Sequence, residues 1–291
     1  MVLECRLSDC SPAVDLGWLL LPGDRSRTDA AGAEPRVQGF FDAWDTGRFP
    51  VSVPFIWEAY DSARLLGAPP VPCLSLCVDP AFALARSGSP LVRVLSDGQL
   101  AGFYAFCWDL LSGPPLSEHV LARLRHSAGS LGEDGIVRHI SFMLSRSPAA
   151  LKMDVRIPSH RVGGYLRSLR SIGWSGDPAA AQAAVERYQP DSAMIGLNLI
   201  VEPWEPSPLE IEFCLAGSFP EQKKKFLDRL IESGMCTLEK SRFLHDVIRR
   251  PVLCGAPQGP DLARSWYAKV RFLKGRPIEA KAYIGIIPRF T

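Results

Sequence analysis

The sequence predicts an α+β protein in which antiparallel strands close into a β-barrel with the helices outside it. One observation is that pairs of short predicted strands alternate several times with helices. The other is that the predicted strands carry apolar residues on one face and charged or tyrosine residues on the other. A parallel α/β sheet would instead alternate single strands with single helices. With helices over the apolar faces, we expect about ten strands to enclose a polar lumen.

The composition is that of one ordinary globular domain covering residues 1–291. Hydrophobic residues make up 47% of the chain, enough for a sizeable core. Lys and Arg number 33 against 31 Asp and Glu, so the chain lacks the basic excess typical of non-specific nucleic-acid binding. The N-terminus shows no targeting segment, and the apolar run Leu16–Leu21 is too short to cross a bilayer. We therefore expect a cytoplasmic protein with neither a membrane nor a nucleic-acid partner.

The eight cysteines do not form a metal-binding pattern. Cys73 and Cys77 have a metal-like spacing, but no second pair or nearby histidine completes a zinc site. In a strand, positions four apart share a face, so both fit a buried, reduced role. The sequence predicts no metal centre.

The N-terminal part of the chain contains few clear signals. Residues 22–36 are polar, small and aperiodic, and we expect a mobile loop there. Apolar residues at helical spacing predict a first helix from Pro54 to Gly67. Strands are predicted at Cys73–Val78, Leu91–Leu95 and Ala101–Trp108, and residues 96–98 are expected to form the turn between the last two.

The C-terminal part predicts a regular succession of hairpins and helices. Three hairpins are expected, made of Val137–Leu144 with Leu151–Ile157, Met194–Val201 with Leu209–Leu215, and Trp266–Leu273 with Ile278–Ile286. Helices are expected from the N-cap Ser117, from Ser159 to Gly173, from Pro178, over 218–234, and in a segment that stops at Pro251.

The polar faces of these strands carry the candidate functional residues. They are Lys152, Asp154 and Arg156, then Glu210 and Glu212, then Tyr267, Lys269 and Arg271, then Lys281 and Tyr283. An antiparallel sheet that is covered on one side normally turns its polar face to bulk water. The mixture of tyrosines, cations and a few carboxylates favours an enclosed lumen instead. A cationic lumen of this kind needs an anionic guest.

The chain resembles the aromatic prenyltransferases of the PT-barrel, or ABBA, family, whose barrels are built from repeated αββα units. Within that family it is similar to the cyanobactin-type peptide prenyltransferases. The resemblance rests on the layout from about Leu91 onward and on three segments, Ala150–Arg156, Trp266–Phe272 and Glu279–Tyr283.

This resemblance implies an enzyme that transfers a prenyl group from dimethylallyl, geranyl or farnesyl diphosphate to an electron-rich side chain of a peptide. The acceptor would be cyclic or otherwise modified, as in RiPP biosynthesis, and the enzyme would work as a monomer. No tightly bound cofactor is implied, although Mg²⁺ can accompany the diphosphate. By resemblance, the diphosphate would be gripped by Arg93, Lys152, Arg156, Lys269, Arg271 and Lys281, and the allylic cation would be shielded by Tyr267 and Tyr283.

These residue types suit that chemistry. Fixed cations stabilise a departing diphosphate, and arginine binds phosphate oxygens in pairs. The faces of tyrosine rings stabilise positive charge. Asp154 and Glu212 are the candidate bases for the proton lost by the acceptor, and each is also a candidate for an internal salt bridge.

Two other functions remain open at this stage. One is prenyl transfer to a free small aromatic molecule. The other is a barrel that binds an anionic or amphipathic small molecule without catalysis. The aspartate-rich motif of the helical prenyl-diphosphate enzymes is absent from the sequence.

Overall fold

A computed structural model describes most of the chain. It covers residues 2–7, 14–23, 35–60, 73–79, 95–112, 115–144, 149–188, 193–202, 209–214, 220–249, 262–273 and 276–288. Arg93 and the predicted strand before Leu95 lie outside these ranges, as do residues 24–34 of the predicted loop.

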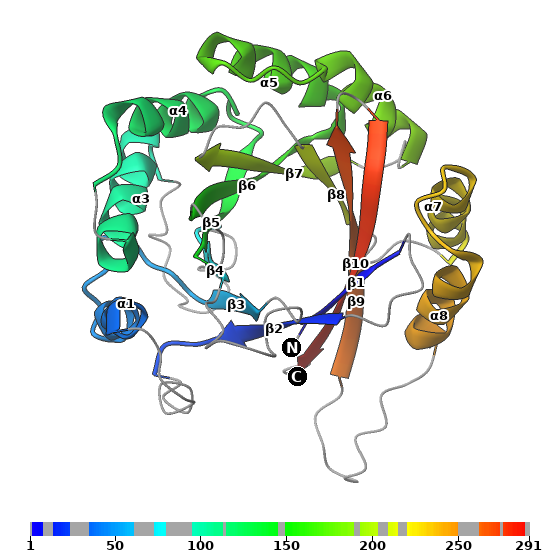
Figure 1. The fold of residues 1–291 in the computed structure, drawn as a ribbon, viewed down its shortest axis with the longest axis horizontal. Helices are drawn as coiled ribbons and strands as arrows, with labels where there is room; N and C mark the ends of the chain where they lie inside the picture. Colours follow the sequence, from blue (N-terminus) through cyan, green and yellow to red (C-terminus); the bar gives the residue numbers. More distant parts are fainter. Residues whose placement is uncertain are drawn as a thin grey trace, which may run out of the picture.

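Ten antiparallel strands close into a barrel (Figure 1). Each strand pairs with its neighbours in the chain, and β1 pairs with both β2 and β10, so the two ends of the chain meet in one sheet. The strands are β1 (Val2–Arg6), β2 (Val14–Leu20), β3 (Ile56–Tyr60), β4 (Cys73–Cys77), β5 (Ile136–Met143), β6 (Ala150–Pro158), β7 (Met194–Glu202), β8 (Leu209–Cys214), β9 (Leu262–Leu273) and β10 (Arg276–Pro288).

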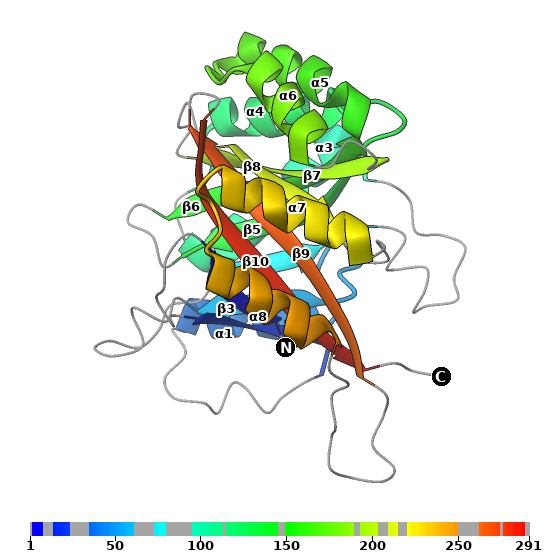
Figure 2. The same cartoon turned by 90° about the vertical axis from the view of Figure 1, so that its right-hand side faces the viewer.

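The helices lie outside the ring of strands (Figures 1 and 2). They follow the successive strand pairs along the chain, so helices separate each pair from the next. They are α1 (Pro35–Asp45), α3 (Asp97–Ser112), α4 (Glu118–Gly129), α5 (Val162–Ser168), α6 (Pro178–Tyr188), α7 (Pro220–Glu232) and α8 (Leu238–Arg249). The predicted α+β barrel with external helices is therefore confirmed. No helix in the described ranges is both long and apolar enough to cross a membrane.

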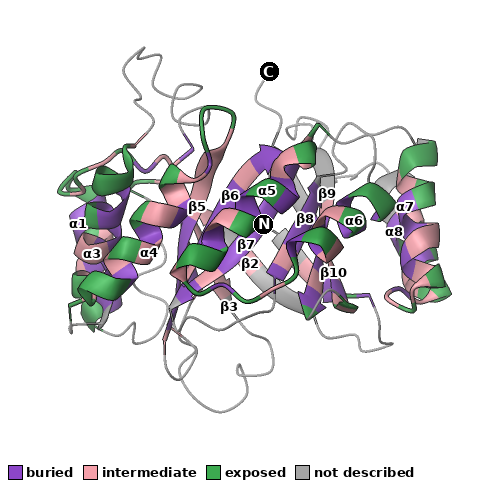
Figure 3. Cartoon of the chain, turned by 90° about the horizontal axis from the view of Figure 1, so that it is seen from above, coloured by how far each residue is buried: buried purple, intermediate pink, exposed green. Residues whose placement is uncertain are grey.

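The hydrophobic core lies between the barrel and the helices (Figure 3). On β6, Leu151, Met153, Val155 and Ile157 are buried on the outer, helix-covered face. The residues between them therefore face the interior of the barrel, because side chains alternate along a strand. Burial of the outer face thus fixes which side chains line the lumen.

Several local predictions in the C-terminal part are confirmed. Ser117 caps α4 by accepting a hydrogen bond from the Val120 amide. Gly173 ends the helical segment after α5 with a φ of 93°, in the left-handed region that glycine adopts without strain. Asp177 accepts hydrogen bonds from the first amides of α6. The three predicted hairpins are β5–β6, β7–β8 and β9–β10.

Two predictions in the N-terminal part are wrong. The helix predicted from Pro54 begins instead as β3, which pairs with β2 and β4. The segment Ala101–Trp108, which was predicted to be a strand, belongs to helix α3. The prediction failed because a continuous apolar run does not distinguish a strand from a buried helix. The turn predicted at 96–98 is the start of that helix. Ser96 and Gln99 exchange hydrogen bonds there as a capping box.

The predicted mobile loop over 22–36 is also partly wrong. Its last two residues, Pro35 and Arg36, begin helix α1. Proline suits that first turn because its missing amide hydrogen would have no partner there.

Candidate functional site

The inner face of the barrel gathers charged and tyrosine side chains from both ends of the chain. The strand register puts Glu212 opposite Lys269, Lys269 opposite Lys281, and Tyr267 opposite Tyr283. β1 adds Glu4 opposite Tyr283. The predicted polar face is therefore the lining of a closed barrel rather than the open side of a flat sheet.

Arg138 is the centre of this polar network, and the sequence did not predict it. It donates hydrogen bonds to both carboxylate oxygens of Asp154, at 3.2 and 3.3 Å, and another to Glu212. Burial alone would lower the pKa of Arg138, but the two carboxylates outweigh it and hold the pKa well above its usual range. Asp154 and Glu212, the candidate bases, are thus tied to the same guanidinium group.

A register shift between Val137 and His139 turns Arg138 inward. Strict alternation would put Arg138 on the helix-covered face with Ile140. An extra residue in one strand lets two successive side chains point into the lumen. Gly196 then leaves room for Glu212 to reach this guanidinium, because a Cβ at position 196 would lie 2.9 Å from the Glu212 Cβ.

Most cations of the predicted diphosphate clamp already have a carboxylate partner. The contacts are Lys152 with Glu210 at 2.6 Å, Lys269 with Glu212 at 3.4 Å, Lys281 with Glu4 at 2.6 Å, and Arg271 with Glu279 at 3.8 Å. Most of the predicted clamp cations are therefore held in internal ion pairs. An incoming anion would have to compete with these carboxylates.

Arg156 is different from the other predicted clamp residues. It is half-buried on the inner face of β6, opposite Ile136 on β5 and Gly196 on β7. Neither neighbour offers a polar side chain, and Arg156 makes no hydrogen bond or ion pair within the described ranges. Its guanidinium group can bind an anion without breaking an existing contact.

Tyr267 and Tyr283 stack on each other beside Lys269. Their ring centroids are 4.6 Å apart and their planes differ by 1°. The Lys269 ammonium lies 5.0 Å from the centroid of Tyr283 and 5.7 Å from that of Tyr267. Burial raises the pKa of both phenols, so they are neutral near pH 7. The pair already contacts one positive charge through its π-systems.

Two further polar groups of the inner face have buried atoms without a partner. His139 Nε2 and Asn198 Nδ2 make no hydrogen bond within the part of the chain that the structure describes. Burial and the neighbouring Arg138 lower the pKa of His139 well below its usual range, so its ring is neutral. The Asn198 carbonyl oxygen accepts a hydrogen bond from Lys269.

The pair of Lys152 with Glu210 predicts a pH-dependent stability. Burial would raise the pKa of Glu210, but Lys152 and Lys269 outweigh it and lower the pKa to about 2. The folded pKa is thus below the unfolded one, so this contribution is present above about pH 4.5 and is lost as the pH falls towards 2. We expect Lys152→Met to lower the free energy of unfolding by about 2 kcal/mol at pH 7.

Urea unfolding at pH 7 and pH 3 checks this prediction. The difference in free energy of unfolding between the variant and the parent protein should be smaller at pH 3. The matched control is Lys224→Met, which removes an exposed pair with Asp228. That change should cost no more than about 0.5 kcal/mol. Equal losses of stability in Lys152→Met and Lys224→Met would contradict the prediction that burial strengthens the pair of Lys152 with Glu210.

Comparisons with known proteins do not assign this chain to a family. Neither a scan against models of protein families nor a search of curated proteins found a match. Within the described ranges, no three His, Cys, Asp or Glu side chains gather in a way that could hold a metal ion.

Proposed function

We propose that this protein transfers a prenyl group from an allylic diphosphate to an electron-rich side chain of a peptide. The observation that carries the proposal is the stacked pair of Tyr267 and Tyr283 on the inner face of a closed barrel, with Lys269 over the rings and Arg156 unpaired. The order of the elements also supports it, since helices separate successive antiparallel hairpins as in αββα barrels.

In the proposed reaction, the bond between the allylic carbon and the diphosphate oxygen breaks, and its electron pair leaves with the diphosphate. Arg156 binds the departing anion, because, among the clamp residues that the structure describes, it is the one whose guanidinium has no partner to exchange. Lys269 and Lys281 contribute if the anion displaces Glu212 and Glu4. The ring faces of Tyr267 and Tyr283 stabilise the allylic cation.

The acceptor side chain then attacks the cation and loses a proton. Asp154 and Glu212 are the carboxylates available for that proton, and Arg138 fixes the position of both. A general base has to lie within hydrogen-bond reach of the proton that it takes. Their shared anchor means that either carboxylate acts at the same place in the lumen.

Arg156→Ala tests the proposal. The protein is incubated with dimethylallyl, geranyl or farnesyl diphosphate and with peptides, free tyrosine and free tryptophan, with and without Mg²⁺. Product masses and released diphosphate are measured. Charged hydrogen bonds of roughly 1.5–3 kcal/mol predict that Arg156→Ala lowers turnover about 10- to 100-fold. Arg170→Ala, at an exposed position outside the barrel, is the matched control and should leave turnover unchanged.

The acceptors separate the remaining functions. Alkylation of free amino acids but not of peptides would favour a small-molecule prenyltransferase. If the parent protein releases diphosphate from none of the three donors, prenyl transfer is excluded and a binding role remains.

A further inference from the structure

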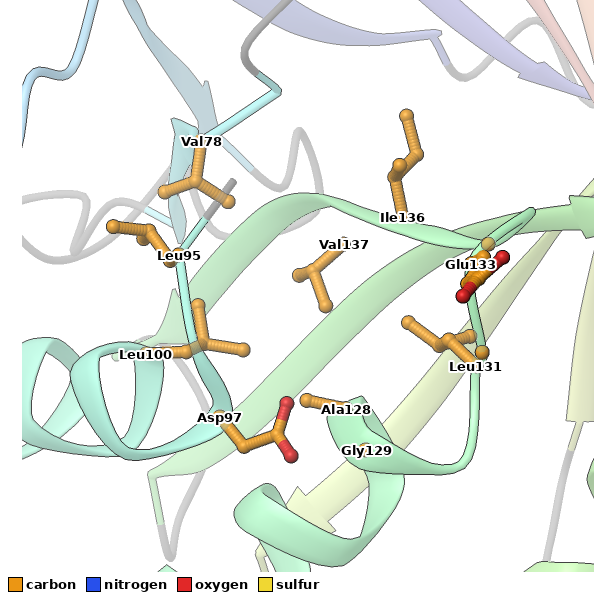
Figure 4. A pocket seen from close by; sticks show the side chains of 12 residues that line it. Val78, Leu95, Asp97, Leu100, Ala128, Gly129, Leu131, Glu133, Ile136 and Val137 are labelled. Atoms are coloured by element: carbon orange, nitrogen blue, oxygen red, sulfur yellow. The ribbon is translucent and has the colours of Figure 1, made fainter. Parts of the chain in front are cut away.

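A cavity of about 280 Å³ lies between α3, the end of α4 and the start of β5 (Figure 4). Its lining comes from three parts of the chain, namely Val78 after β4, residues 95–100 at the start of α3, and residues 128–137 from the end of α4 to the start of β5. Val137 lies on the outer face of β5, whereas Ile136 lies on the inner face, opposite Arg156. The cavity therefore reaches both faces of β5 at the start of this strand.

Leucine and valine side chains form the apolar part of this cavity, and polar groups form nearly half of its surface. Leu100 and Leu131 are almost completely buried behind it, whereas Val78, Leu95 and Val137 are partly exposed. A half-open apolar hollow of this size accommodates one large aliphatic or aromatic side chain. Burying such a side chain would be favourable, because apolar surface leaves water on both sides of the contact.

Two carboxylates, Asp97 and Glu133, flank the apolar walls. Both are exposed, and they come from different elements, the first turn of α3 and the loop after α4 (Figure 4). Neither forms an ion pair within the described ranges. The nearby Arg161 pairs with Asp134 at 3.6 Å, so those two charges cancel. Among the residues that the structure describes, the flanks of the cavity therefore carry an excess of negative charge.

Glycines preserve this arrangement. A Cβ at Gly129 would lie 2.6 Å from a carboxylate oxygen of Asp97, so a side chain there would push the carboxylate away. A Cβ at Gly135 would lie 2.9 Å from the Leu131 side chain. The close approach of the Asp97 carboxylate to the end of α4 thus depends on the absence of a side chain at position 129.

We infer that this cavity is a docking site for the acceptor peptide, which inserts an apolar side chain between two flanking basic residues. The apolar walls take the side chain, and Asp97 and Glu133 pair with lysine or arginine on either side of it. A chain with basic residues on both sides of an apolar one meets both carboxylates at once, which a single amine does not. The inference rests on the proposed function only in identifying the bound peptide as the acceptor.

Binding is measured by fluorescence anisotropy without any prenyl donor, so the result does not depend on turnover. The probes are fluorescein-labelled dodecapeptides of glycine and serine with a central Arg-Leu-Arg, Arg-Ser-Arg or Glu-Leu-Glu. We expect the first to bind about tenfold more tightly than either of the others. The cavity is filled in Ala128→Leu, and both flanking charges are removed in Asp97→Asn with Glu133→Gln.

The filled variant should bind the Arg-Leu-Arg probe at least tenfold more weakly than the parent protein. The charge-neutral double variant should bind it about three- to tenfold more weakly, as expected for exposed ion pairs. The matched control is Glu221→Gln with Asp246→Asn, which removes two exposed charges on α7 and α8 and should change nothing. Circular dichroism verifies that each variant is folded.

Equal binding of the leucine and serine probes, or no loss in Ala128→Leu, would overturn the docking site. If the control variant loses as much affinity for the Arg-Leu-Arg probe as the charge-neutral double variant does, the effect comes from the overall charge of the protein. That result would also overturn the docking site. Selective binding without turnover of any donor would retain the docking site and reject prenyl transfer. Turnover of peptides with unaltered kinetics in Ala128→Leu would retain prenyl transfer and reject this cavity as the docking site.

Discussion

Replacing Arg138 with methionine should lower the free energy of unfolding by about 3–5 kcal/mol at pH 7. Asp154 and Glu212 are 6% and 4% exposed, and Arg138 hydrogen-bonds to both. Within the described part of the chain, removing the guanidinium leaves Asp154 without its ion-pair partner and leaves Glu212 with Lys269 alone, at 3.4 Å. A buried carboxylate without full compensation pays a desolvation penalty of several kcal/mol, whereas methionine keeps most of the packing.

Urea unfolding at pH 7 measures this loss, and a triple variant identifies its cause. Adding Asp154→Asn and Glu212→Gln to Arg138→Met removes the two buried charges, so we expect much of the lost stability to return. The control is Arg125→Met, which breaks an exposed contact with Glu118 and should cost less than about 1 kcal/mol. A loss below 1 kcal/mol for Arg138→Met would show that water reaches these carboxylates and that the network is not buried.

The sequence predicts much of the C-terminal half of the barrel because parts of its strands alternate clearly. Over Leu151–Ile157 of β6 and Tyr267–Phe272 of β9, every second residue is apolar and buried, and the others are charged or tyrosine. That alternation predicts both that the segment is a strand and which of its side chains face the lumen. The N-terminal strands are different. β1 and β3 are five residues long, and the apolar residues after Pro54 also fit a helical spacing.

Helix α3 shows how two local signals can conflict. Ser96-Asp97-Gly98 between apolar segments reads as a hairpin turn, yet Ser96 and Gln99 have the spacing of a capping box. The capping box agrees with the structure, in which α3 continues from Asp97 to Ser112. Ser117, by contrast, precedes an alternation of apolar and polar residues that only a helix explains.

Within the site, the sequence predicts which side chains share the lumen but not how their charges pair. Glu4 lies near the N-terminus and Lys281 near the C-terminus, and only closure of the barrel brings them to 2.6 Å. Arg138 faces the lumen because of a register shift, and nothing in the sequence indicates that shift. The expectation that Asp154 and Glu212 are candidates for internal salt bridges is confirmed, but the sequence did not predict that Glu4 and Glu210 also pair with lumenal lysines.

The proposed shield of the allylic cation yields the last prediction, which concerns the fate of the donor rather than its rate of use. Tyr283 stacks face to face on Tyr267 and lies opposite Glu4 in the register of β1 and β10. Tyr283→Phe keeps the ring face and loses only the hydroxyl, so alkylation should still dominate.

Tyr283→Ala removes the ring and opens space for water beside the cation. We expect the ratio of prenyl alcohol to alkylated product to rise at least tenfold, a change of about 1.4 kcal/mol in relative barriers. Quantifying both products by mass spectrometry decides the matter, with thermal unfolding to verify that each variant is folded. If the alanine and phenylalanine variants partition the donor as the parent does, Tyr283 does not shield a carbocation and the reaction does not take place beside these rings.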